Sequence, residues 1–364
     1  MTEGKLRIGV LGAGSILAAH AAGFLKNSEA CEVVAVAKAD PTRAEAVHTL
    51  FGPDVAVEGD YRAVLAREDV DAVDILLPHD LHLPATLAAA EAGKPVLVEK
   101  VMARNVYECD RMIEACEQAG VSLSVCHDRR YQPDWMALKR VVDRGLLGEV
   151  YYWRMEHNQN VDLPPGHWCR SRDALGGGAV VSCLTHQIDG LRWYAGEVDS
   201  VTCMTKTIPS RMKGETIGVI TARMQSGALA QVTINWATHS GGSREGNSLW
   251  GEFNHVTGSR GEAYYLSGQG TFLMLYDEPE RAAGLVEEAT PVAESFLRLR
   301  TGNWSGHERC IGEWIKLLRG EPAELSTTGR DSRGTVEVAE AAYRAEETGC
   351  TVELPLIPRP WPGS

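Results

Sequence analysis

Apolar and polar residues follow two different patterns along this chain, and the change falls near residue 130. Before it, short continuous apolar runs alternate with stretches in which apolar positions recur about every three to four residues. The first pattern is typical of strands buried on both faces, and the second of helices packed on one side. The predicted strands are Leu6–Leu11, Glu32–Ala37, Ala72–Leu77, Pro95–Val98 and Ser122–Cys126. The predicted helices are Ile16–Lys26, Pro41–Phe51, Leu83–Ala92 and Val106–Ala119.

Alternation of single strands with single helices is the signature of a doubly wound parallel sheet. Gly93 and Gly120 stand where left-handed caps would end two of the helices. We therefore expect an α/β Rossmann domain that binds a dinucleotide over residues 1–128.

The remaining chain, residues 129–364, predicts an α+β domain for substrate binding and oligomerisation. It begins with a helix and then alternates hydrophobic with polar positions, as in an open, mainly antiparallel sheet with one covered face. The predicted strands are Val150–Glu156, Asp199–Thr207, Thr216–Met224, Leu229–Ala237 and Glu262–Tyr276, and the helices are Asp134–Arg144, Glu308–Leu318 and Thr335–Thr348. Such a sheet carries more apolar surface than these helices cover, which predicts a homodimer or homotetramer.

Composition narrows the range of partners. The 364 residues carry a net charge of −13, which argues against nucleic acid and favours a neutral or weakly charged small molecule. No apolar run reaches the ~20 residues of a membrane span, and no secretory leader precedes the first strand. Nine scattered cysteines, never spaced Cys-x-x-Cys, predict buried thiols and a cytoplasmic location rather than a zinc or redox motif.

A glycine-rich loop follows the first strand and opens the first helix. Gly12 is suited to the tight turn, and Gly14 allows close approach of a pyrophosphate to the helix N-terminus at Ser15 and Ile16. The third glycine of the usual motif is replaced by Leu17. The loop predicts NAD or NADP as the cofactor.

The residues after the second strand bear on the choice between the two dinucleotides. An acidic residue there would hold the adenosine ribose diol of NAD, but Lys38 occupies the position and favours the 2′-phosphate of NADP. Alternatively, Lys38 points to solvent and Asp40 or Arg43 makes the contact.

Two further segments suggest hydride chemistry on a hydroxyl group. Lys100 follows Glu99 at the carboxyl end of a buried strand, and His186 follows a triple-glycine turn. An imidazole titrates near neutral pH, and an ammonium group stabilises a developing alkoxide. The alternatives are a salt-bridged surface Lys100 and a helix-capping His186.

These motifs resemble the glucose–fructose oxidoreductase, inositol dehydrogenase and rhizopine-catabolism (Gfo/Idh/MocA) family. The resemblance runs over Ile8–His20, Val70–His82, Gly93–Met102, Arg129–Pro133, Gly148–Val150, Gly176–Gly196 and Ala342–Gly349. It implies oxidoreduction of a sugar, glycoside or polyol with a nicotinamide cofactor. By this resemblance Lys100 hydrogen-bonds the reacting hydroxyl, Glu99 lies beside the cofactor, and His186 is the general base.

The resemblance also implies further contacts. The turn with Pro78, His79 and His82 would line the nicotinamide ribose, although His82 is equally explained as a buried structural histidine. Arg170 would contact the cofactor, with Cys169 interrupting the usual Trp-Arg pair. Two histidines without a third ligand nearby predict no metal. Residues expected at the substrate, besides Lys100 and His186, are Arg129, His157, Asn158, Trp168, Ser182 and His307; Asn160, Arg172 and Trp304 are additional polar or aromatic candidates.

Val101 and Ser182 also depart from the family pattern. Val101 replaces a proline and alters backbone stiffness rather than chemistry. Ser182 stands where many polyol dehydrogenases of the family have an aspartate that faces the histidine. This argues against simple inositol dehydrogenase activity and leaves oxidation at sugar carbon 3, or reduction of a keto-sugar, open.

The combined prediction is an NAD(P)-dependent dehydrogenase acting on a secondary hydroxyl or the corresponding ketone. A glycoside-cleaving or sugar-to-sugar oxidoreductase of the same fold, with tightly bound and recycled NAD, is the first alternative. A sensor that binds dinucleotide without catalysis is the second, and it would need neither Lys100 nor His186.

Overall fold

The computed structural model describes residues 4–238, 251–276, 289–293 and 296–361. The chain divides into two compact units. The first contains the described residues up to Asp128, together with 305–336 and 358–361. The second contains the described residues of 129–304 and 337–357.

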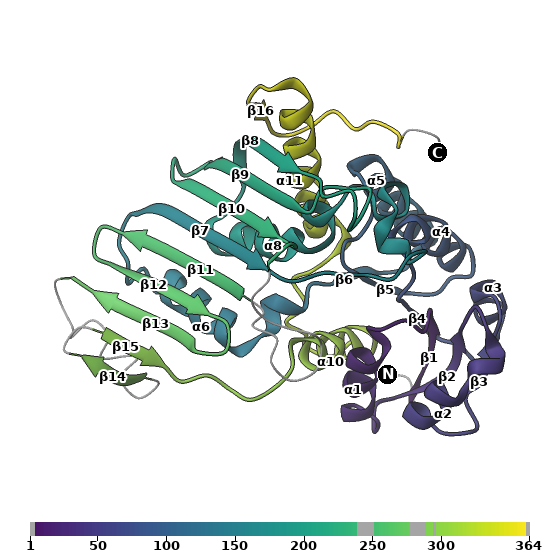
Figure 1. Ribbon diagram of the computed structural model, residues 1–364. Coiled ribbons are helices and arrows are strands. Elements are labelled where there is room, and N and C mark those ends of the chain that lie inside the picture. Colours follow the sequence, from purple (N-terminus) through teal and green to yellow (C-terminus); the bar gives the residue numbers. More distant parts are fainter. Residues whose placement is uncertain (1–3, 239–250, 277–288, 294–295, 362–364) are drawn as a thin grey trace. The chain divides into compact units, whose positions relative to one another are not determined.

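The first unit is built on a six-stranded parallel sheet with the strand order β3-β2-β1-β4-β5-β6 (Figure 1). The strands are β1 Leu6–Leu11, β2 Cys31–Ala37, β3 Ala56–Glu58, β4 Ala72–Ile75, β5 Val96–Glu99 and β6 Leu123–Cys126. β4, β5 and β6 are buried along their whole length, as their continuous apolar sequence predicts. The predicted Rossmann sheet is confirmed.

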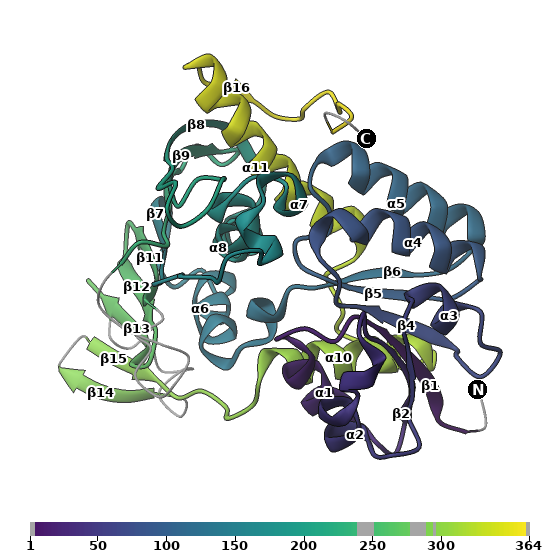
Figure 2. The same cartoon turned by 45° about the vertical axis from the view of Figure 1, so that its right-hand side comes forward.

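Helices cover both faces of this sheet, with α1 and α10 on one face and α4 and α5 on the other (Figure 2). Their bounds are α1 Leu17–Lys26, α2 Glu45–Phe51, α3 Tyr61–Leu65, α4 His82–Glu91, α5 Val106–Ala119 and α10 Gly306–Leu318. Sequence patterning assigned α10 to the second domain, whereas in the structure it belongs to the first unit. Gly23 of α1 allows the close packing, because a Cβ atom there would lie 2.6 Å from Ile311 Cδ1.

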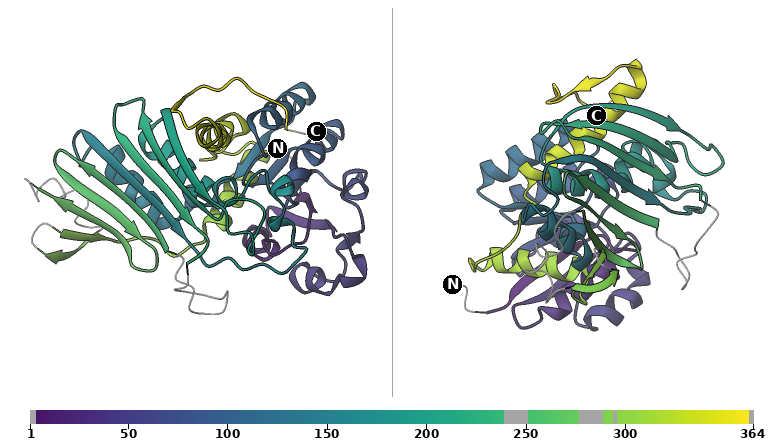
Figure 3. Two further views of the ribbon diagram at one scale, coloured as in Figure 1. Left: turned by 45° about the horizontal axis from the view of Figure 1, so that its top comes forward. Right: turned by 90° about the vertical axis from the view of Figure 1, so that its left-hand side faces the viewer.

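The second unit is built on a ten-stranded sheet with the order β14-β15-β13-β12-β11-β7-β10-β9-β8-β16 (Figure 3). β7 and β10 run parallel, and the other neighbours run antiparallel. The strands are β7 Val150–Asn158, β8 Val198–Lys206, β9 Ile217–Met224, β10 Leu229–Asn235, β11 Gly251–Gly258, β12 Gly261–Leu266, β13 Gly270–Leu275, β14 Ala289–Ala293, β15 Phe296–Leu299 and β16 Val352–Glu353. The single strand predicted over 262–276 is wrong: it is the hairpin β12–β13, which turns at Gly268 with φ 74°.

One face of the large sheet packs on α6 and α8, which Figure 2 shows along the same side. The helices of this unit are α6 Pro133–Asp143, α7 Arg172–Leu175, α8 Thr185–Ala195 and the greater part of α11 Gly329–Thr348, with a π-helical segment at Val180–Leu184. Tyr194 of α8 joins α6 to the sheet, because its ring lies 5.6 Å from Trp153 and 6.0 Å from Trp135. The predicted second fold, an α+β domain with a large and mainly antiparallel sheet, is confirmed.

None of the helices in the described residues is long and apolar enough to cross a membrane.

Candidate active site

The glycine loop between β1 and α1 has the shape expected of a dinucleotide cradle. Gly12 has φ 115°, and a Cβ atom at this position would lie 2.6 Å from the carbonyl oxygen of Leu76, so the fold itself requires glycine. Gly14 differs, because a Cβ atom there would meet no protein atom within 4 Å. Protein packing therefore explains Gly12, whereas Gly14 leaves room for a group that approaches the loop from outside. Leu17 is buried and fills the place of the missing third glycine.

Lys38 reaches back to this loop. Its Nζ lies 3.5 Å from the carbonyl oxygen of Ala13, which puts the ammonium group beside the cradle. The Asp40 carboxylate accepts hydrogen bonds from the backbone N–H and hydroxyl of Thr42, and thereby caps a short helix. Arg43 is exposed at the end of that helix. Of the three residues predicted near the ribose, Lys38 is the one held at the glycine loop.

Glu99 and Lys100 stand at the carboxyl end of β5, as the sequence predicts. His82 fixes the backbone just beyond them, because its Nδ1 lies 2.9 Å from the carbonyl oxygen of Val101 and its Nε2 lies 2.8 Å from that of Leu77. Burial lowers the pKa of His82 despite these carbonyls. These contacts favour the structural interpretation of His82. The Lys100–Val101 peptide bond is cis.

His79 and Pro78 lie in the same turn. The His79 ring is buried 5.5 Å from that of His82, and Pro78 precedes the short helix His79–Leu81. Both residues follow β4 at the carboxyl edge of the sheet, where dinucleotides bind in this fold. Their contact with the cofactor stays a prediction.

Glu99 contacts a buried histidine that sequence analysis did not identify. His20 Nε2 lies 3.0 Å from Glu99 Oε1, and His20 Nδ1 lies 2.7 Å from Asp74 Oδ2. Burial opposes charge on Glu99, but hydrogen bonds from His20 and His307 outweigh it and hold the pKa of Glu99 well below its usual range. Burial likewise opposes charge on His20, yet Asp74 and Cys126 raise the pKa of His20 well above its ordinary value. Two signals were present in the sequence: His20 stands in the apolar stripe of its helix, and Asp74 interrupts an apolar strand.

His307 joins this cluster in the first unit. Its Nε2 lies 3.6 Å from Glu99 Oε1, and its Nδ1 lies 3.6 Å from Asp128 Oδ2. The sequence suggested a substrate contact for His307, but both ring nitrogens face carboxylates of this unit.

In the second unit, the triple-glycine turn is tied to two polar side chains. The Tyr343 hydroxyl donates to Glu215 Oε1 and accepts from the backbone N–H of Gly178 and Val181. A Cβ atom on Gly177 would lie 2.2 Å from the Tyr343 hydroxyl, and one on Gly178 would lie 2.2 Å from the carbonyl oxygen of Glu215. Glycine is therefore needed so that the turn can pack directly on Tyr343 and Glu215.

This turn leads to α8, which carries His186 in its first turn. Asp189, three residues later, forms a buried bidentate ion pair with Arg130. Arg130 Nη2 lies 2.7 Å from Asp189 Oδ1, and Arg130 Nε lies 2.8 Å from Asp189 Oδ2. The aspartate of the motif thus anchors the helix. Ser182 lies in the π-helical segment before α8, so it does not share one regular α-helical face with His186.

Behind His186 lies a row of polar side chains. The rings of His186 and His157 are stacked, with their centroids 6.2 Å apart and their planes inclined by 8°. His157 Nδ1 lies 3.6 Å from Glu252 Oε1, which accepts hydrogen bonds from Arg129 at 2.8 and 3.0 Å. The structure therefore brings together three predicted residues, Arg129, His157 and His186. Glu252 was not predicted, because the strand that carries it, β11, was not among the strands predicted from the sequence.

Other predicted residues have structural partners. The Arg170 guanidinium donates to the carbonyl oxygens of Leu163 and Ser210, and so holds the loop before the glycine turn. Asn160 accepts from Arg211, and Trp304 Nε1 donates to the carbonyl oxygen of Tyr131. Asn158 ends β7, Trp168 stacks on His167 at 6.1 Å, and Arg172 begins α7. Roles for Arg170, Asn158 and Trp168 at cofactor or substrate stay predictions.

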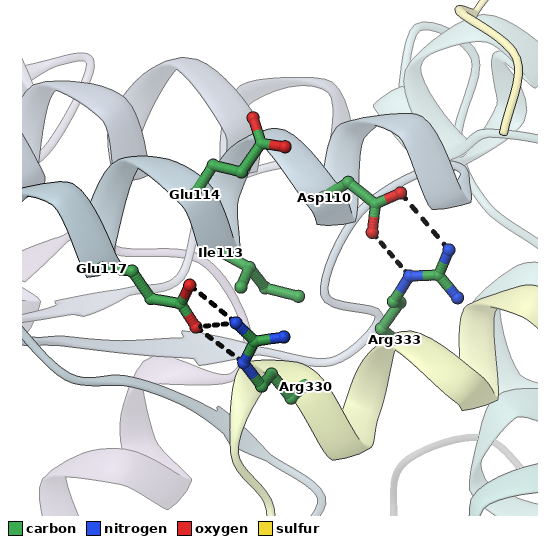
Figure 4. A pocket seen from close by; sticks show the side chains of 6 residues that line it. All are labelled: Asp110, Ile113, Glu114, Glu117, Arg330 and Arg333. Atoms are coloured by element: carbon green, nitrogen blue, oxygen red, sulfur yellow. Dashed lines mark hydrogen bonds and ion pairs between the residues drawn. The ribbon is translucent and has the colours of Figure 1, made fainter.

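A surface hollow on the first unit lies between α5 and the start of α11. It is lined by Asp110, Ile113, Glu114, Glu117, Arg330 and Arg333. Figure 4 shows Arg330 directed at Glu117 and Arg333 at Asp110, with hydrogen bonds between them. The two arginines of the hollow are paired with two of its carboxylates, and none of its lining residues was predicted to be catalytic. We therefore do not assign the hollow to the active site.

A glycine cradle at the carboxyl edge of a doubly wound parallel sheet is typical of nicotinamide-dependent oxidoreductases. Residues 6–127 match the description "Oxidoreductase family, NAD-binding Rossmann fold", and residues 135–264 match "GFO/IDH/MocA C-terminal domain". The chain belongs to the Gfo/Idh/MocA oxidoreductase family, which confirms the resemblance.

Characterised relatives extend over most of the chain. D-apiose dehydrogenase of Rhizobium rhizogenes is 26% identical over 333 residues, which cover 90% of this chain and 92% of that protein. Inositol 2-dehydrogenase 4 of Saccharopolyspora erythraea is 32% identical over 241 residues, which cover 64% of this chain and 68% of that protein. The WlbA dehydrogenase of Bordetella pertussis, solved with NADH and UDP-GlcNAcA, has a TM-score of 0.81 at 23% identity, covers 98% of this chain and 100% of its own, and supports the fold.

The residues present fit a nicotinamide dinucleotide. The open space at Gly14, the position of Lys38 and the edge formed by Pro78, Glu99 and Lys100 lie along the carboxyl ends of β1, β2, β4 and β5. Cofactors bind along this edge of doubly wound sheets.

Proposed function

We propose that this protein is an NAD(P)-dependent dehydrogenase that oxidises a secondary hydroxyl group of a sugar, glycoside or polyol, or reduces the corresponding ketone. The observation that carries the proposal is the row His186–His157–Glu252–Arg129, which backs an imidazole at the start of α8 with a second imidazole and a buried ion pair. The dehydrogenase relatives that act on apiose and inositol support the same substrate class.

Oxidation of an alcohol removes a hydride from carbon and a proton from oxygen. The bound cofactor supplies the hydride acceptor, so the protein must supply a proton acceptor and a positive charge for the oxygen. His186 takes the proton from the hydroxyl, and Lys100 binds the same oxygen and stabilises its developing negative charge. In the reverse direction, His186 returns the proton to the ketone oxygen.

The residues behind His186 orient its ring. The ring of His157 packs flat against that of His186, and Glu252 supplies the carboxylate that faces His157. Arg129 holds Glu252 in place through two hydrogen bonds to Glu252 Oε1. Arg130 and Asp189 fix the helix that carries the base. We assign positioning roles to Glu252 and Asp189. Arg129 and His157 take the same role in this proposal, in place of the substrate contacts predicted from the sequence.

Further contacts complete the proposal. Asn158, Trp168 and Ser182 offer polar and aromatic groups of the kind that bind sugar rings. Ser182 cannot take up a proton, so His186 alone acts as the base, and oxidation at sugar carbon 3 or reduction of a keto-sugar is favoured over simple inositol oxidation. Lys38, held at the glycine loop, favours NADP over NAD.

The test is nicotinamide absorbance after mixing the protein with NAD or NADP and a panel of sugars, glycosides and inositols. Reduced cofactor that accumulates past one equivalent per chain supports a dehydrogenase that releases its cofactor. A rise that stops at one equivalent or less contradicts the proposal and favours glycoside cleavage or sugar-to-sugar transfer with bound NAD. Binding without absorbance change or product from any substrate would favour a sensor.

We also propose that the outer face of the large sheet packs against a second copy of the chain in a homodimer or homotetramer. This face carries an aromatic row in which the Tyr264 ring lies 5.1 Å from Phe272, and the Phe272 ring 5.5 Å from Phe296. Met204 is 77% exposed and Leu229 is 45% exposed. Exposed aromatic and aliphatic side chains of this kind commonly contribute to subunit interfaces. A monomer in sedimentation at micromolar concentration would contradict it.

The nine cysteines are free thiols in the structure, which suits the reducing cytoplasm expected from the sequence.

A further inference from the structure

Four side chains of the first unit that can ligate metals converge on one point beneath the sheet edge. They are His20 from α1, Glu99 from the end of β5, Cys126 from the end of β6 and His307 from α10. One nitrogen, oxygen or sulfur atom from each lies within 4.8 Å of the others. His20, Glu99 and Cys126 are buried, and the side chain of His307 is 16% exposed.

The two imidazoles are oriented as in metal centres. Both Nε2 atoms approach Glu99 Oε1, at 3.0 and 3.6 Å, so the rings point to a common site. Each Nδ1 faces a different carboxylate, Asp74 for His20 at 2.7 Å and Asp128 for His307 at 3.6 Å. Ligating histidines characteristically have a carboxylate at the other ring nitrogen, which fixes the ring and its tautomer.

We infer that His20, Glu99, Cys126 and His307 form a binding site for one divalent transition-metal ion, with Zn²⁺ as the ion that best fits. Two nitrogens, one thiolate and one carboxylate suit a borderline-soft ion with tetrahedral preference. In a zinc site with ligand bonds of roughly 2.0–2.3 Å, the ligand atoms lie about 3.3–3.8 Å apart, so the widest separation here closes by about 1 Å on binding. Four protein ligands close the site, which makes it structural rather than catalytic.

The charges of the ligand set suit a divalent ion in a buried setting. One thiolate and one carboxylate balance the two positive charges of Zn²⁺, and the two imidazoles bind as neutral ligands. This proposal replaces the expectation of no metal, which considered local spacing, whereas these ligands come from four distant parts of the sequence.

The inference is independent of the dehydrogenase proposal, because its test measures bound metal and not enzymatic activity. Untagged full-length protein is purified without chelator and assayed for zinc, then stripped with a chelator and titrated with Co²⁺. We expect one ion per chain, a tetrahedral cobalt spectrum and a thiolate-to-cobalt charge-transfer band. Cys126→Ser should lose that band, and Asp128→Asn should weaken binding about tenfold or more.

Cys31→Ser is the matched control, because Cys31 is a buried cysteine whose Sγ contacts the carbonyl oxygens of Phe24 and Asn27 instead. It should leave metal content and spectrum unchanged. Substoichiometric zinc in the purified protein together with no charge-transfer band at saturating Co²⁺ would overturn the inference. So would a band that persists in Cys126→Ser. If that variant does not fold, the cobalt spectrum of the wild-type protein decides the question.

Discussion

His186 and His157 lie with their rings stacked 6.2 Å apart and inclined by only 8°. The ring of His157 is itself 3.6 Å from the Glu252 carboxylate. In the proposed mechanism these two neighbours orient the ring of the base. This arrangement also makes Glu252, which is remote from His186 in sequence, a residue with a predicted effect on the reaction.

Glu252→Gln should lower kcat about tenfold or more while the Kd for dinucleotide stays unchanged. The substitution removes the negative charge next to His157 and leaves the buried Arg129 without its counter-ion. Steady-state kinetics with cofactor-binding titrations provide the measurement. Glu262→Gln is the matched control, because Glu262 also contacts a histidine, His255 at 3.0 Å, in the same sheet. Equal effects of the two substitutions would contradict the role of Glu252.

Lys38→Ala should lower kcat/KM for NADP about tenfold and change that for NAD little. The reason is the loss of an ammonium group beside the glycine loop, where it can pair with a 2′-phosphate. Arg43→Ala, tested in parallel, should leave the ratio unchanged. A loss of kcat/KM for NADP in Arg43→Ala but not in Lys38→Ala would assign the contact with the 2′-phosphate to Arg43.

Gly12→Ala and Gly14→Ala should act differently. Gly14→Ala should fold with an unchanged Tm but bind dinucleotide about tenfold more weakly, because its methyl group enters the space meant for the pyrophosphate. Gly12→Ala should lower the free energy of unfolding by about 1–3 kcal/mol, because it combines a positive φ with a clash against Leu76. Thermal unfolding and fluorescence titration separate the two effects. Normal dinucleotide binding by Gly14→Ala would exclude the loop as the cradle.

Glu215 should make stability depend on pH. Burial raises the pKa of Glu215 above its unfolded value, although Tyr343 and Val180 donate hydrogen bonds to it. A carboxyl group whose pKa is raised by folding stabilises the folded state below its pKa in the unfolded chain, which is about 4.3. This stabilisation is lost as the pH rises through the pKa of the group in the folded protein.

Glutamine at this position can accept both hydrogen bonds but does not ionise. The free energy of unfolding of Glu215→Gln relative to wild type should therefore increase from about pH 4.5 to about pH 7. Urea unfolding at several pH values measures it, with the exposed Glu353→Gln as control. A difference that stays constant with pH would show that Glu215 does not titrate in this range.

The pattern of apolar and polar residues predicted the strands and helices of the first unit well, because each of them is specified by residues close together in sequence. β1 and α5 were predicted residue for residue, and β5 and β6 to within one residue at each end, because continuous apolar runs bounded by glycine or proline specify buried strands and capped helices. The short β3 and α3 were missed, because three to five residues carry too little periodicity.

The candidate site was predictable in part. Lys100, Gly12 and His186 belong to local motifs, and the structure places each at the strand end, loop or helix that the motif predicts. His20, Glu252 and Glu215 were missed, because their environments arise from strands and helices distant in sequence. The sequence likewise contains no sign that His307 lies near Glu99, because only the packing of α10 on α1 brings the two together. Its contact with substrate stays a prediction.

The central claim is that Lys100 and His186 act on the reacting hydroxyl group. Its most direct test is single-turnover hydride transfer by Lys100→Ala and His186→Ala with the best substrate of the panel, alongside dinucleotide titration of both variants. We predict that each loses at least about a hundredfold in the rate of hydride transfer while the Kd for dinucleotide stays close to wild type. Hydride transfer at the wild-type rate in either variant would contradict the account.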